Sequence, residues 1–227
     1  MKVCEIYKSI QGEGRYIGIT SIFLRLGGCN LNCKYCDTKY SWKNYRDIEI
    51  KEVIEKLEKY EAKALSITGG EPLLQIEECV ELIKHISKTY QLIIIETNGT
   101  LTNEIEYISY FNVVLSISVK TTNFIGHEYD YSELYKLLPK IKNTEKYIKL
   151  VVTDKDDITL IKHIVSEILK NDSTIEIFLQ PARIPKLNYI NLIKKLWVDV
   201  TNDDYLSKTV RLLPQFHTLI FGSKRRV

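Results

Sequence analysis

SIFLRLGGCNLNCKYC, at residues 21–36, joins an apolar run typical of a buried strand to three closely spaced cysteines. Cys29, Cys33 and Cys36 are separated by three and then two intervening residues. Three thiolates that converge on one point can bind a metal centre, but they leave one of its corners for a ligand from outside the protein. The spacing therefore favours a metal centre that carries out chemistry over one that only holds the fold together.

Two simpler explanations of the cysteines fit the sequence less well. The chain has five cysteines, an odd number, and its N-terminus shows no apolar signal stretch, which disfavours a disulfide framework. A structural zinc site needs a fourth Cys or His, but Cys79 and His85 downstream fit no ribbon or finger spacing. Cys79 lies on the apolar face of a predicted helix and Cys4 in a predicted N-terminal strand, where a free cysteine is commonly a small buried hydrophobe.

The composition is that of a soluble globular protein. With 227 residues, 44% of them hydrophobic and 27% charged, the chain is long enough for one sizeable core, and it contains no linker-like stretch. We therefore expect a single domain over residues 1–227. A net charge of +3 is too balanced for a nucleic-acid-binding surface, and no apolar run approaches the roughly 18–20 residues that span a bilayer. Reduced cysteines without a targeting segment favour a cytoplasmic protein with no nucleic-acid or membrane partner.

Short apolar runs alternate with amphipathic stretches along the chain. The predicted strands are residues 21–26, 64–68, 92–97, 113–118, 147–152 and 174–180. Most are rich in β-branched residues and nearly continuous in hydrophobicity, as parallel strands buried on both faces are. Apolar residues at three- and four-residue steps predict helices around residues 50–57, 79–86 and 158–168. Alternating strands and helices imply an α/β fold with a mostly parallel sheet.

Four polar motifs stand where predicted strands end. They are TGGEP at 68–72, ETNGT at 96–100, SVK at 118–120 and QPAR at 180–183. A glycine pair or an Asn-Gly pair after a strand is by itself usually only a turn. In parallel α/β proteins, however, the carboxyl ends of the strands form the binding face. We therefore expect the four motifs to line one cavity, with the cysteine run on the same rim.

Together, CNLNCKYC and TGGEP resemble the radical S-adenosylmethionine (SAM) superfamily, whose members bind a four-iron four-sulfur cluster through a CxxxCxxC loop. SIQGEGRYIGITSIFLRLGGCNLNCKYCDTKYSW at 9–42, with TGGEPLLQ and ETNGT, resembles one family within it, the 7-carboxy-7-deazaguanine synthases of queuosine (7-deazapurine) biosynthesis. The similarity extends from Glu5 to QPAR and resumes at LPQFHTLIFG. It implies an α/β fold: an abbreviated radical-SAM barrel, with a mostly parallel sheet that does not close.

The resemblance also implies an activity, that of a carbon–nitrogen lyase. In the family, 6-carboxy-5,6,7,8-tetrahydropterin becomes 7-carboxy-7-deazaguanine with loss of ammonia, after a 5′-deoxyadenosyl radical takes the hydrogen at C6 and the ring contracts. SAM is regenerated, so it acts as a true cofactor beside the 4Fe-4S cluster and Mg²⁺. The hard reactivity belongs to the cofactor, and the protein supplies placement and exclusion of water. An external electron donor such as flavodoxin or ferredoxin, and a homodimer, are implied in the same way.

The resemblance assigns the cofactor contacts residue by residue. Cys29, Cys33 and Cys36 would bind the iron–sulfur cluster, and Thr38 falls at the family's magnesium position. The residues that match SAM contacts are Tyr35, Cys36, Asp37, Gly70, Glu71, Ser118, Val119, Lys120, Gln180, Pro181, Ala182 and Arg183. Val119 stands where the family has proline in a Ser-Pro-Lys segment.

Substrate contacts are assigned mainly to the N-terminal segment. The residues that match them are Ile10, Gln11, Gly12, Arg25, Thr68 and Val227. Arg25 has an independent rationale, because a guanidinium suits a substrate carboxylate and is costly inside so apolar a strand. The alternative is an arginine whose head reaches solvent. Glu13 could recognise the aminopyrimidine edge of the pterin or lie on the surface, Glu96 and Asn98 could belong only to a turn, and His217 could lie near substrate.

Two other functions share part of this pattern. A radical-SAM activating enzyme, which places a radical on a partner protein, would have the cysteines and TGGEP but not SIQGEG or CDTKYSW. A non-enzymatic module would use the thiolates to hold zinc or a passive cluster for a protein contact. Anaerobic reconstitution separates these alternatives, because a colourless zinc protein would contradict the iron–sulfur hypothesis.

Thr38 gives the first testable prediction. A hydroxyl can join an octahedral magnesium shell when substrate and water supply the other ligands. We expect Thr38→Ala to weaken the stimulation of turnover by Mg²⁺, measured as initial rates across a magnesium titration. An unchanged magnesium dependence would remove Thr38 from the site.

Overall fold

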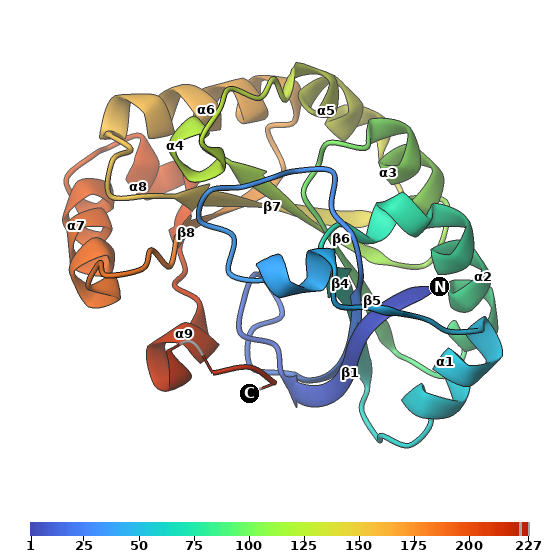
Figure 1. Cartoon of the computed structure of the whole chain (residues 1–227). Coiled ribbons are helices and arrows are strands. Elements are labelled where there is room, and N and C mark those ends of the chain that lie inside the picture. Colours follow the sequence, from blue (N-terminus) through green and yellow to red (C-terminus); the bar gives the residue numbers. More distant parts are fainter. Residues whose placement is uncertain (223, 227) are drawn as a thin grey trace.

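A curved sheet of nine strands forms the framework of the chain in a computed structural model, which describes residues 1–222 and 224–226. The strand order is β3-β1-β2-β4-β5-β6-β7-β8-β9. Helices pack on the outer, convex face, while the loop that carries the cysteines crosses the inner, concave face (Figure 1). Because the edge strands β3 and β9 do not pair with each other, the described sheet is an open barrel, as predicted.

The strands divide into a short antiparallel part and a long parallel part. They are β1 (Lys2–Ile10), β2 (Thr20–Leu26), β3 (Arg46–Asp47), β4 (Ala64–Gly69), β5 (Leu92–Thr97), β6 (Val114–Lys120), β7 (Glu145–Val152), β8 (Glu176–Pro181) and β9 (Arg211–Leu212). β1 runs antiparallel to β2 and β3, whereas neighbours from β2 to β9 are parallel. Parallel neighbours need crossover connections, which the helices provide. The carboxyl ends of β2 and β4 to β8 therefore meet at one rim.

The helices lie mostly on the outer face of the sheet. They are α1 (Ile50–Leu57), α2 (Ile76–Ile86), α3 (Thr102–Ile108), α4 (Thr122–Ile125), α5 (Ser132–Leu137), α6 (Ile158–Asn171), α7 (Tyr189–Thr201), α8 (Leu206–Thr209) and α9 (Phe216–Phe221), with 3₁₀ turns η1 (Lys39–Trp42), η2 (Pro72–Gln75) and η3 (Leu138–Lys140). In α6, Ile161, Val165 and Ile168 are buried at four- and three-residue steps. Asp157 caps this helix by accepting a hydrogen bond from Leu160 N–H at 2.8 Å.

The predicted secondary structure is confirmed for the buried elements. The six predicted strands correspond to β2, β4, β5, β6, β7 and β8, and the three predicted helices to α1, α2 and α6. The N-terminal strand that contains Cys4 is β1, and Cys79 is fully buried in the core. β3 and β9 carry no periodic signal, because each pairs over only two residues. Among the helices of the described residues, none is long and apolar enough to span a membrane.

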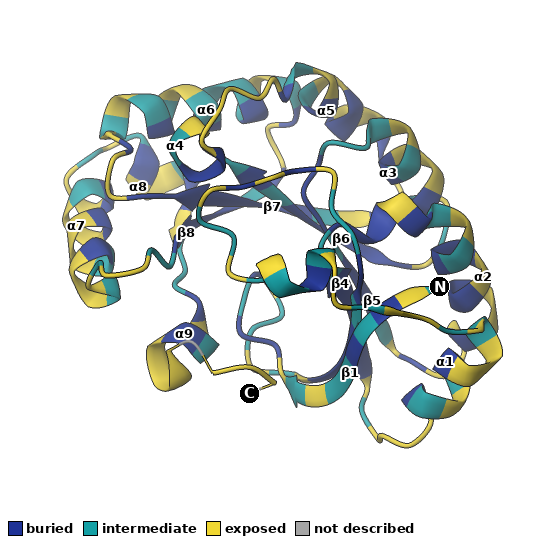
Figure 2. Cartoon of the chain, in the orientation of Figure 1, coloured by how far each residue is buried: buried dark blue, intermediate teal, exposed yellow. Residues whose placement is uncertain are grey.

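Alternate residues of the strands separate the core from the inner face. In β7, Ile148, Leu150 and Val152 belong to the main hydrophobic cluster that the outer helices share. Lys149 and Val151, which alternate with them, line a cavity on the concave side. Figure 2 shows the strands buried between the helices and the inner loops. The period of two along each strand thus decides which side chains reach the cavity.

A buried carboxylate supports the cysteine loop through α4. Asp156 is 1% exposed and accepts hydrogen bonds from Thr121 Oγ1 at 2.8 Å, Thr153 Oγ1 at 3.0 Å and Thr153 N–H at 2.6 Å. The turn that begins at Thr121 then accepts, at Ile125 O, the N–H of Lys34 in the cysteine loop at 2.8 Å. Asp156 therefore fixes a turn on which the metal-binding loop rests.

We expect Asp156→Ala to lower the free energy of unfolding by about 2–4 kcal/mol, because several buried donors lose a charged acceptor together. Urea denaturation monitored by circular dichroism measures the change. Asp154→Ala is the matched control, since Asp154 is an exposed acidic residue of the same loop. Equal stabilities of the two variants would contradict the supporting role of Asp156.

Candidate active site

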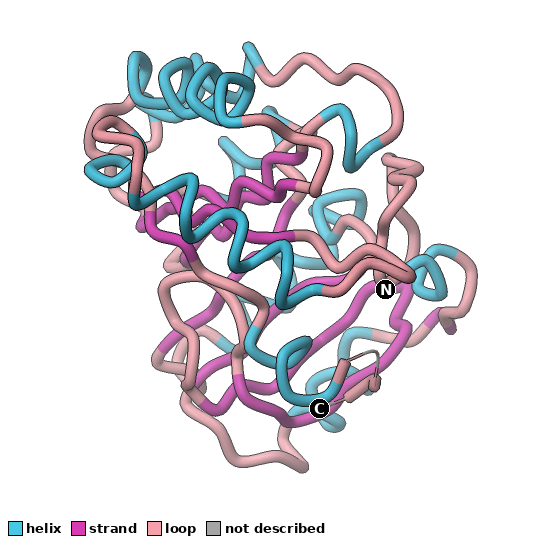
Figure 3. The backbone as a smooth tube through the Cα atoms, turned by 90° about the vertical axis from the view of Figure 1, so that its left-hand side faces the viewer, coloured by secondary structure: helices cyan, strands magenta, loops and turns pink. Residues whose placement is uncertain are grey.

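A cavity lies on the concave side of the sheet, at the carboxyl ends of the parallel strands. Residues of TGGEP, ETNGT, SVK and QPAR line it, together with the cysteine run and the loop after β1. Residues of α9 and the segment 224–226 complete its wall, and Figure 3 shows this C-terminal segment beside the N-terminal strands. The polar motifs therefore meet in one cavity, as their positions at strand ends predict.

Most of the predicted site residues line this cavity. They are Ile10, Gln11, Gly12, Arg25, Cys29, Cys33, Tyr35, Cys36, Asp37, Thr38, Thr68, Gly70, Ser118, Lys120, Gln180, Ala182 and Arg183. Three do not line it: Glu71 is buried behind the TGGEP turn, Val119 packs into the core, and Pro181 is buried at the end of β8. Val227 lies outside the described residues. The ligand contacts assigned to these residues stay predictions.

The three clustered cysteines are free thiols in an apolar setting. Cys29, Cys33 and Cys36 line the cavity and belong to a hydrophobic cluster with Phe124 and Ile125 of α4. Burial raises the pKa of Cys33 to about 11. At neutral pH such a thiol stays protonated unless a metal replaces its proton.

The three thiols fit the demands of an iron–sulfur cluster. In a four-iron cluster each thiolate binds a separate iron atom. The structure brings three free thiols to one cavity and backs them with apolar side chains. The described residues contain no group of three Cys, His, Asp or Glu side chains placed to hold a single metal ion.

The TGGEP turn packs directly against the start of the cysteine loop. Glu71 N–H donates to Gly28 O at 2.9 Å, and a Cβ added to Gly70 would lie 1.8 Å from the same oxygen and 3.0 Å from Cys29 Cβ. Only glycine leaves room for so close an approach of two backbones. Gly70 thus sets the position of the first cysteine.

The Glu71 carboxylate joins TGGEP to the next motif. It is fully buried and accepts hydrogen bonds from Thr97 Oγ1 at 2.8 Å, Asn98 N–H at 2.7 Å and Leu73 N–H at 3.1 Å. Burial raises the pKa of Glu71, although these donors oppose the increase. The Glu71 side chain is therefore used to hold the TGGEP turn against ETNGT. Its position in the motif does not by itself predict this structural role.

Arg25 lies at a positively charged end of the cavity. Its side chain is only 13% exposed, and its Nε donates to Glu5 Oε1 at 2.8 Å and its Nη2 to Tyr7 Oη at 3.1 Å. Arg226 also pairs with Glu5, at 2.8 Å, and Arg225 lines the same wall. Arg25 therefore does not extend into solvent. The single negative charge of Glu5 is shared by Arg25 and Arg226, so this end of the cavity keeps a net positive charge.

The other end of the cavity holds a paired carboxylate, that of Glu13. Lys149 Nζ lies 2.7 Å from Glu13 Oε2, and Gln180 and Gln215 donate to the Glu13 oxygens at 3.2 Å and 2.8 Å. Burial alone would raise the pKa of Glu13, but the charge of Lys149 lowers it to about 2. Glu13 is thus an ionised wall residue of the cavity and not a surface residue.

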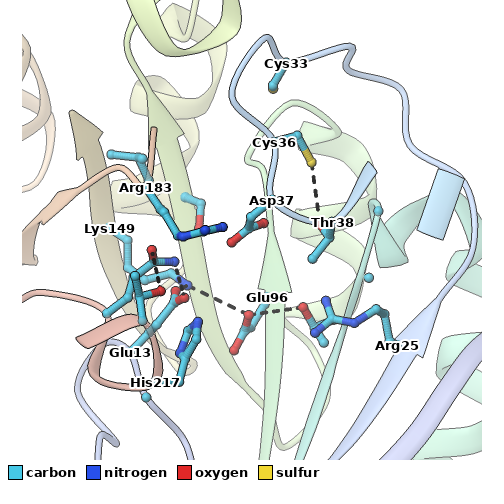
Figure 4. Close-up of a pocket in the computed structure, with 18 of the residues that line it drawn as sticks. Glu13, Arg25, Cys33, Cys36, Asp37, Thr38, Glu96, Lys149, Arg183 and His217 are labelled. Atoms are coloured by element: carbon cyan, nitrogen blue, oxygen red, sulfur yellow. Dashed lines mark hydrogen bonds and ion pairs between the residues drawn. The ribbon is translucent and has the colours of Figure 1, made fainter. Parts of the chain in front are cut away.

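Strand order separates these two ends. Arg25 is on β2 and Lys149 on β7, with β4, β5 and β6 between them. Glu96, on β5, lies between them in the cavity, as Figure 4 shows. His217 also lines the Glu13 end. Glu96 is therefore a lining residue of the cavity and not only a turn residue.

Sequence reasoning missed Lys149, Glu5 and the segment 224–226. Lys149 carries a signal that could have found it: it is an isolated charge in the apolar run YIKLVV, just as Arg25 is in SIFLRL. Glu5 and the C-terminal arginines carry none, because their pairing joins residues more than two hundred positions apart in the sequence.

Known proteins resemble this chain over most of its length. The model of the radical SAM superfamily matches residues 24–153. A 7-carboxy-7-deazaguanine synthase from Methanospirillum hungatei is 34% identical, over 80% of this chain and 72% of that protein. One from Clostridium acetobutylicum is 32% identical, over 99% of this chain and 98% of that protein.

Solved structures agree on the fold. The crystal structure of QueE from Escherichia coli superposes with a TM-score of 0.62 at 21% identity, covering 95% of this chain and 94% of that one. SuiB from Streptococcus suis, bound to its precursor peptide SuiA, also gives a TM-score of 0.62, at 16% identity, but only 46% of that chain is covered.

Gly70 supplies a test of the site geometry. We expect Gly70→Ala to lower the iron bound after anaerobic reconstitution and to cost about 1–3 kcal/mol of stability, because its Cβ would displace the start of the cysteine loop. Iron analysis and thermal melting measure the two effects. Gly18→Ala is the control: its φ of +94° makes alanine strained, but nothing lies within 4 Å, so iron binding should survive. Full iron loading of Gly70→Ala would contradict this geometry.

Proposed function

Because the chain belongs to the 7-carboxy-7-deazaguanine synthase family of the radical SAM superfamily, we propose that it converts 6-carboxy-5,6,7,8-tetrahydropterin to 7-carboxy-7-deazaguanine in queuosine biosynthesis. The enzyme is a radical SAM lyase, and the reaction releases ammonia as the pterin ring contracts. The observation that carries the choice of substrate is a cavity with the Arg25 guanidinium at one end and the acceptor oxygens of Glu13 and Glu96 toward the other.

This charge pattern matches the two ends of the proposed substrate. The pterin carries a carboxylate at C6 and an aminopyrimidinone ring, rich in N–H donors, at the far end. Arg25, with Arg225 and Arg226 beside it, suits the carboxylate. Glu13 and Glu96 suit the N–H donors, because ionised carboxylates only accept hydrogen bonds. The charges therefore orient the substrate along the strand order from β2 to β7.

The chain's own residues fit the proposed cofactors. Cys29, Cys33 and Cys36 would hold a 4Fe-4S cluster, and SAM would lie between the cluster and the Glu13 end of the cavity, against Gly70, Ser118 and Gln180. When bound, these groups supply one-electron cleavage of SAM and hydrogen abstraction from the substrate. Lys120 is half-buried near Cys33, with its Nζ donating to Ser118 O at 3.0 Å. Its charge would offset negative charge on the cluster and on the SAM carboxylate.

The remaining residues would bind, orient and shield. Gln11, held between Ser66 and Glu96, places the loop after β1 against the ring. Gln215 ties α9 to Glu13, so this helix closes the Glu13 end and limits access of water to the reacting atoms. These contacts supply the placement that a radical reaction requires of its protein.

A magnesium ion is proposed at Thr38. Its side chain lines the cavity, and its Oγ1 lies 3.5 Å from Cys36 Sγ, so a cation there would lie between the cluster and the substrate carboxylate. Substrate and water would complete the octahedral shell. We also propose a cytoplasmic homodimer supplied with electrons by a flavodoxin or ferredoxin. Family resemblance supports these assignments.

Anaerobic turnover with 6-carboxytetrahydropterin, SAM, reductant and magnesium tests the function, with the deazaguanine product as readout. We expect Arg25→Met to lower kcat/KM by about 10- to 100-fold, because a charged hydrogen-bond partner of the carboxylate is lost. Arg15→Met is the control, since Arg15 pairs with Glu145 and Glu176 away from the cavity.

Each outcome has a defined meaning. A tetrahydropterin without the carboxylate should be used equally poorly by the wild type and Arg25→Met, because Arg25 then has no partner. A brown protein that cleaves SAM but leaves the carboxytetrahydropterin unchanged would contradict the proposed reaction and favour an activating enzyme.

A further inference from the structure

Lys149 is a buried cation that none of the cofactor or substrate assignments uses. It lies in the middle of β7, and its side chain is 3% exposed. A lysine this deep is costly unless it is paired. We propose that Lys149 is a positioning residue, which holds the carboxylates of Glu13 and Glu96 aligned on one edge of the bound pterin. The identity of that ligand rests on the proposed function.

The geometry places one ammonium group between two carboxylates. Lys149 Nζ lies 2.7 Å from Glu13 Oε2 and 3.9 Å from Glu96 Oε2. Glu13 comes from the loop after β1, Glu96 from β5 and Lys149 from β7, so three separate segments meet at this nitrogen. Figure 4 shows Lys149 beside Glu13, with Glu96 on the side toward Arg25.

Neutral donors fix the orientation of each carboxylate. Gln215 donates to Glu13 Oε1 at 2.8 Å, and Gln11 donates to Glu96 Oε1 at 2.9 Å. Thr68 Oγ1 donates to Glu96 Oε2 at 3.1 Å. A carboxylate has about four acceptor positions, so both groups keep lone pairs for a ligand in the cavity. Two held carboxylates then present acceptors to it, one from the loop after β1 and one from β5.

The charge of Lys149 offsets the negative charge at Glu13. Two half-buried carboxylates near one point repel each other, and a cation between them reduces that repulsion. The titratable and charged groups that face this cluster are Glu13, Glu96, Tyr147 on β7, Lys120 on β6, Arg183 after β8, Tyr189 on α7 and His217 on α9. The lowered pKa of Glu13, about 2, agrees with the pairing.

Ionisation matters because the proposed ligand edge consists of donors. The amino group and ring N–H of an aminopyrimidinone need acceptors, and a protonated carboxyl group would present an O–H donor to one of them. Lys149 thereby acts on substrate binding through Glu13 and Glu96, without touching the substrate itself.

The test compares three variants of the cluster-loaded enzyme between about pH 6 and about pH 8. We expect Lys149→Met to raise KM by about 10- to 100-fold, with a larger increase at the lower pH, because Glu13 loses the cation that lowers its pKa and takes up a proton more readily as the pH falls. Lys149→Arg keeps the charge and should keep the pH dependence of the wild type. Lys146→Met is the matched control: Lys146 is on the same strand, pairs with Asp172 at 3.0 Å and does not line the cavity.

A wild-type KM and pH profile in Lys149→Met would overturn the assignment. So would identical pH profiles of Lys149→Met and Lys149→Arg, which would show that only packing matters. If Lys149→Met shows no cooperative thermal melt, Lys149→Gln replaces it. Equilibrium binding of 6-carboxypterin, followed by its fluorescence, repeats the comparison without turnover. If the wild type binds 6-carboxypterin but forms no product in the turnover assay, the proposed reaction is contradicted. If the product forms but Lys149→Met behaves like the wild type, this inference is contradicted.

Discussion

The structure depends on one constraint, the burial of charge on the concave face of an otherwise apolar sheet. Arg25 and Lys149 each interrupt a strand whose neighbouring residues belong to the core. Each is paired with a carboxylate from another segment, Glu5 for Arg25 and Glu13 for Lys149. Removing one partner of such a pair leaves an uncompensated charge and is strongly destabilising. The two ion pairs that compensate the buried charges therefore also set the electrostatics of the cavity.

The cysteine loop depends on a second, shorter chain of contacts. Gly70 lets the TGGEP turn lie against Gly28, Glu71 ties that turn to ETNGT, and Asp156 braces the α4 turn on the other side. None of these residues needs to touch a cofactor to matter. They act on the position of the loop, because a metal centre needs ligands whose orientation is fixed by their surroundings.

The sequence predicts the strands and the position of the cavity better than the side-chain contacts that line it. Strands such as 92–97 are long, apolar and β-branched, so their pattern is unambiguous, and motifs that follow them must share a rim. Arg25 was found because a charge in a buried strand demands a partner, and Lys149 obeys the same rule. Glu71 shows the limit of motif reading, since its carboxylate faces three donors of the protein. Contacts such as Gln215 with Glu13 leave no local signal, because only the curvature of the folded sheet brings these distant segments together.

The distance along the chain between contacting residues also orders the assembly of the cavity. The TGGEP turn meets the cysteine loop across about forty residues, within neighbouring parallel strands. Glu13 meets Gln215, and Glu5 meets Arg226, across more than two hundred residues. Contacts that close long loops are slower to form, because more chain entropy is lost before they are made. The thiol-bearing half of the site can therefore take shape while the opposite wall is still absent. This order gives an iron–sulfur cluster an open route into its loop before α9 and the arginine segment narrow the entrance.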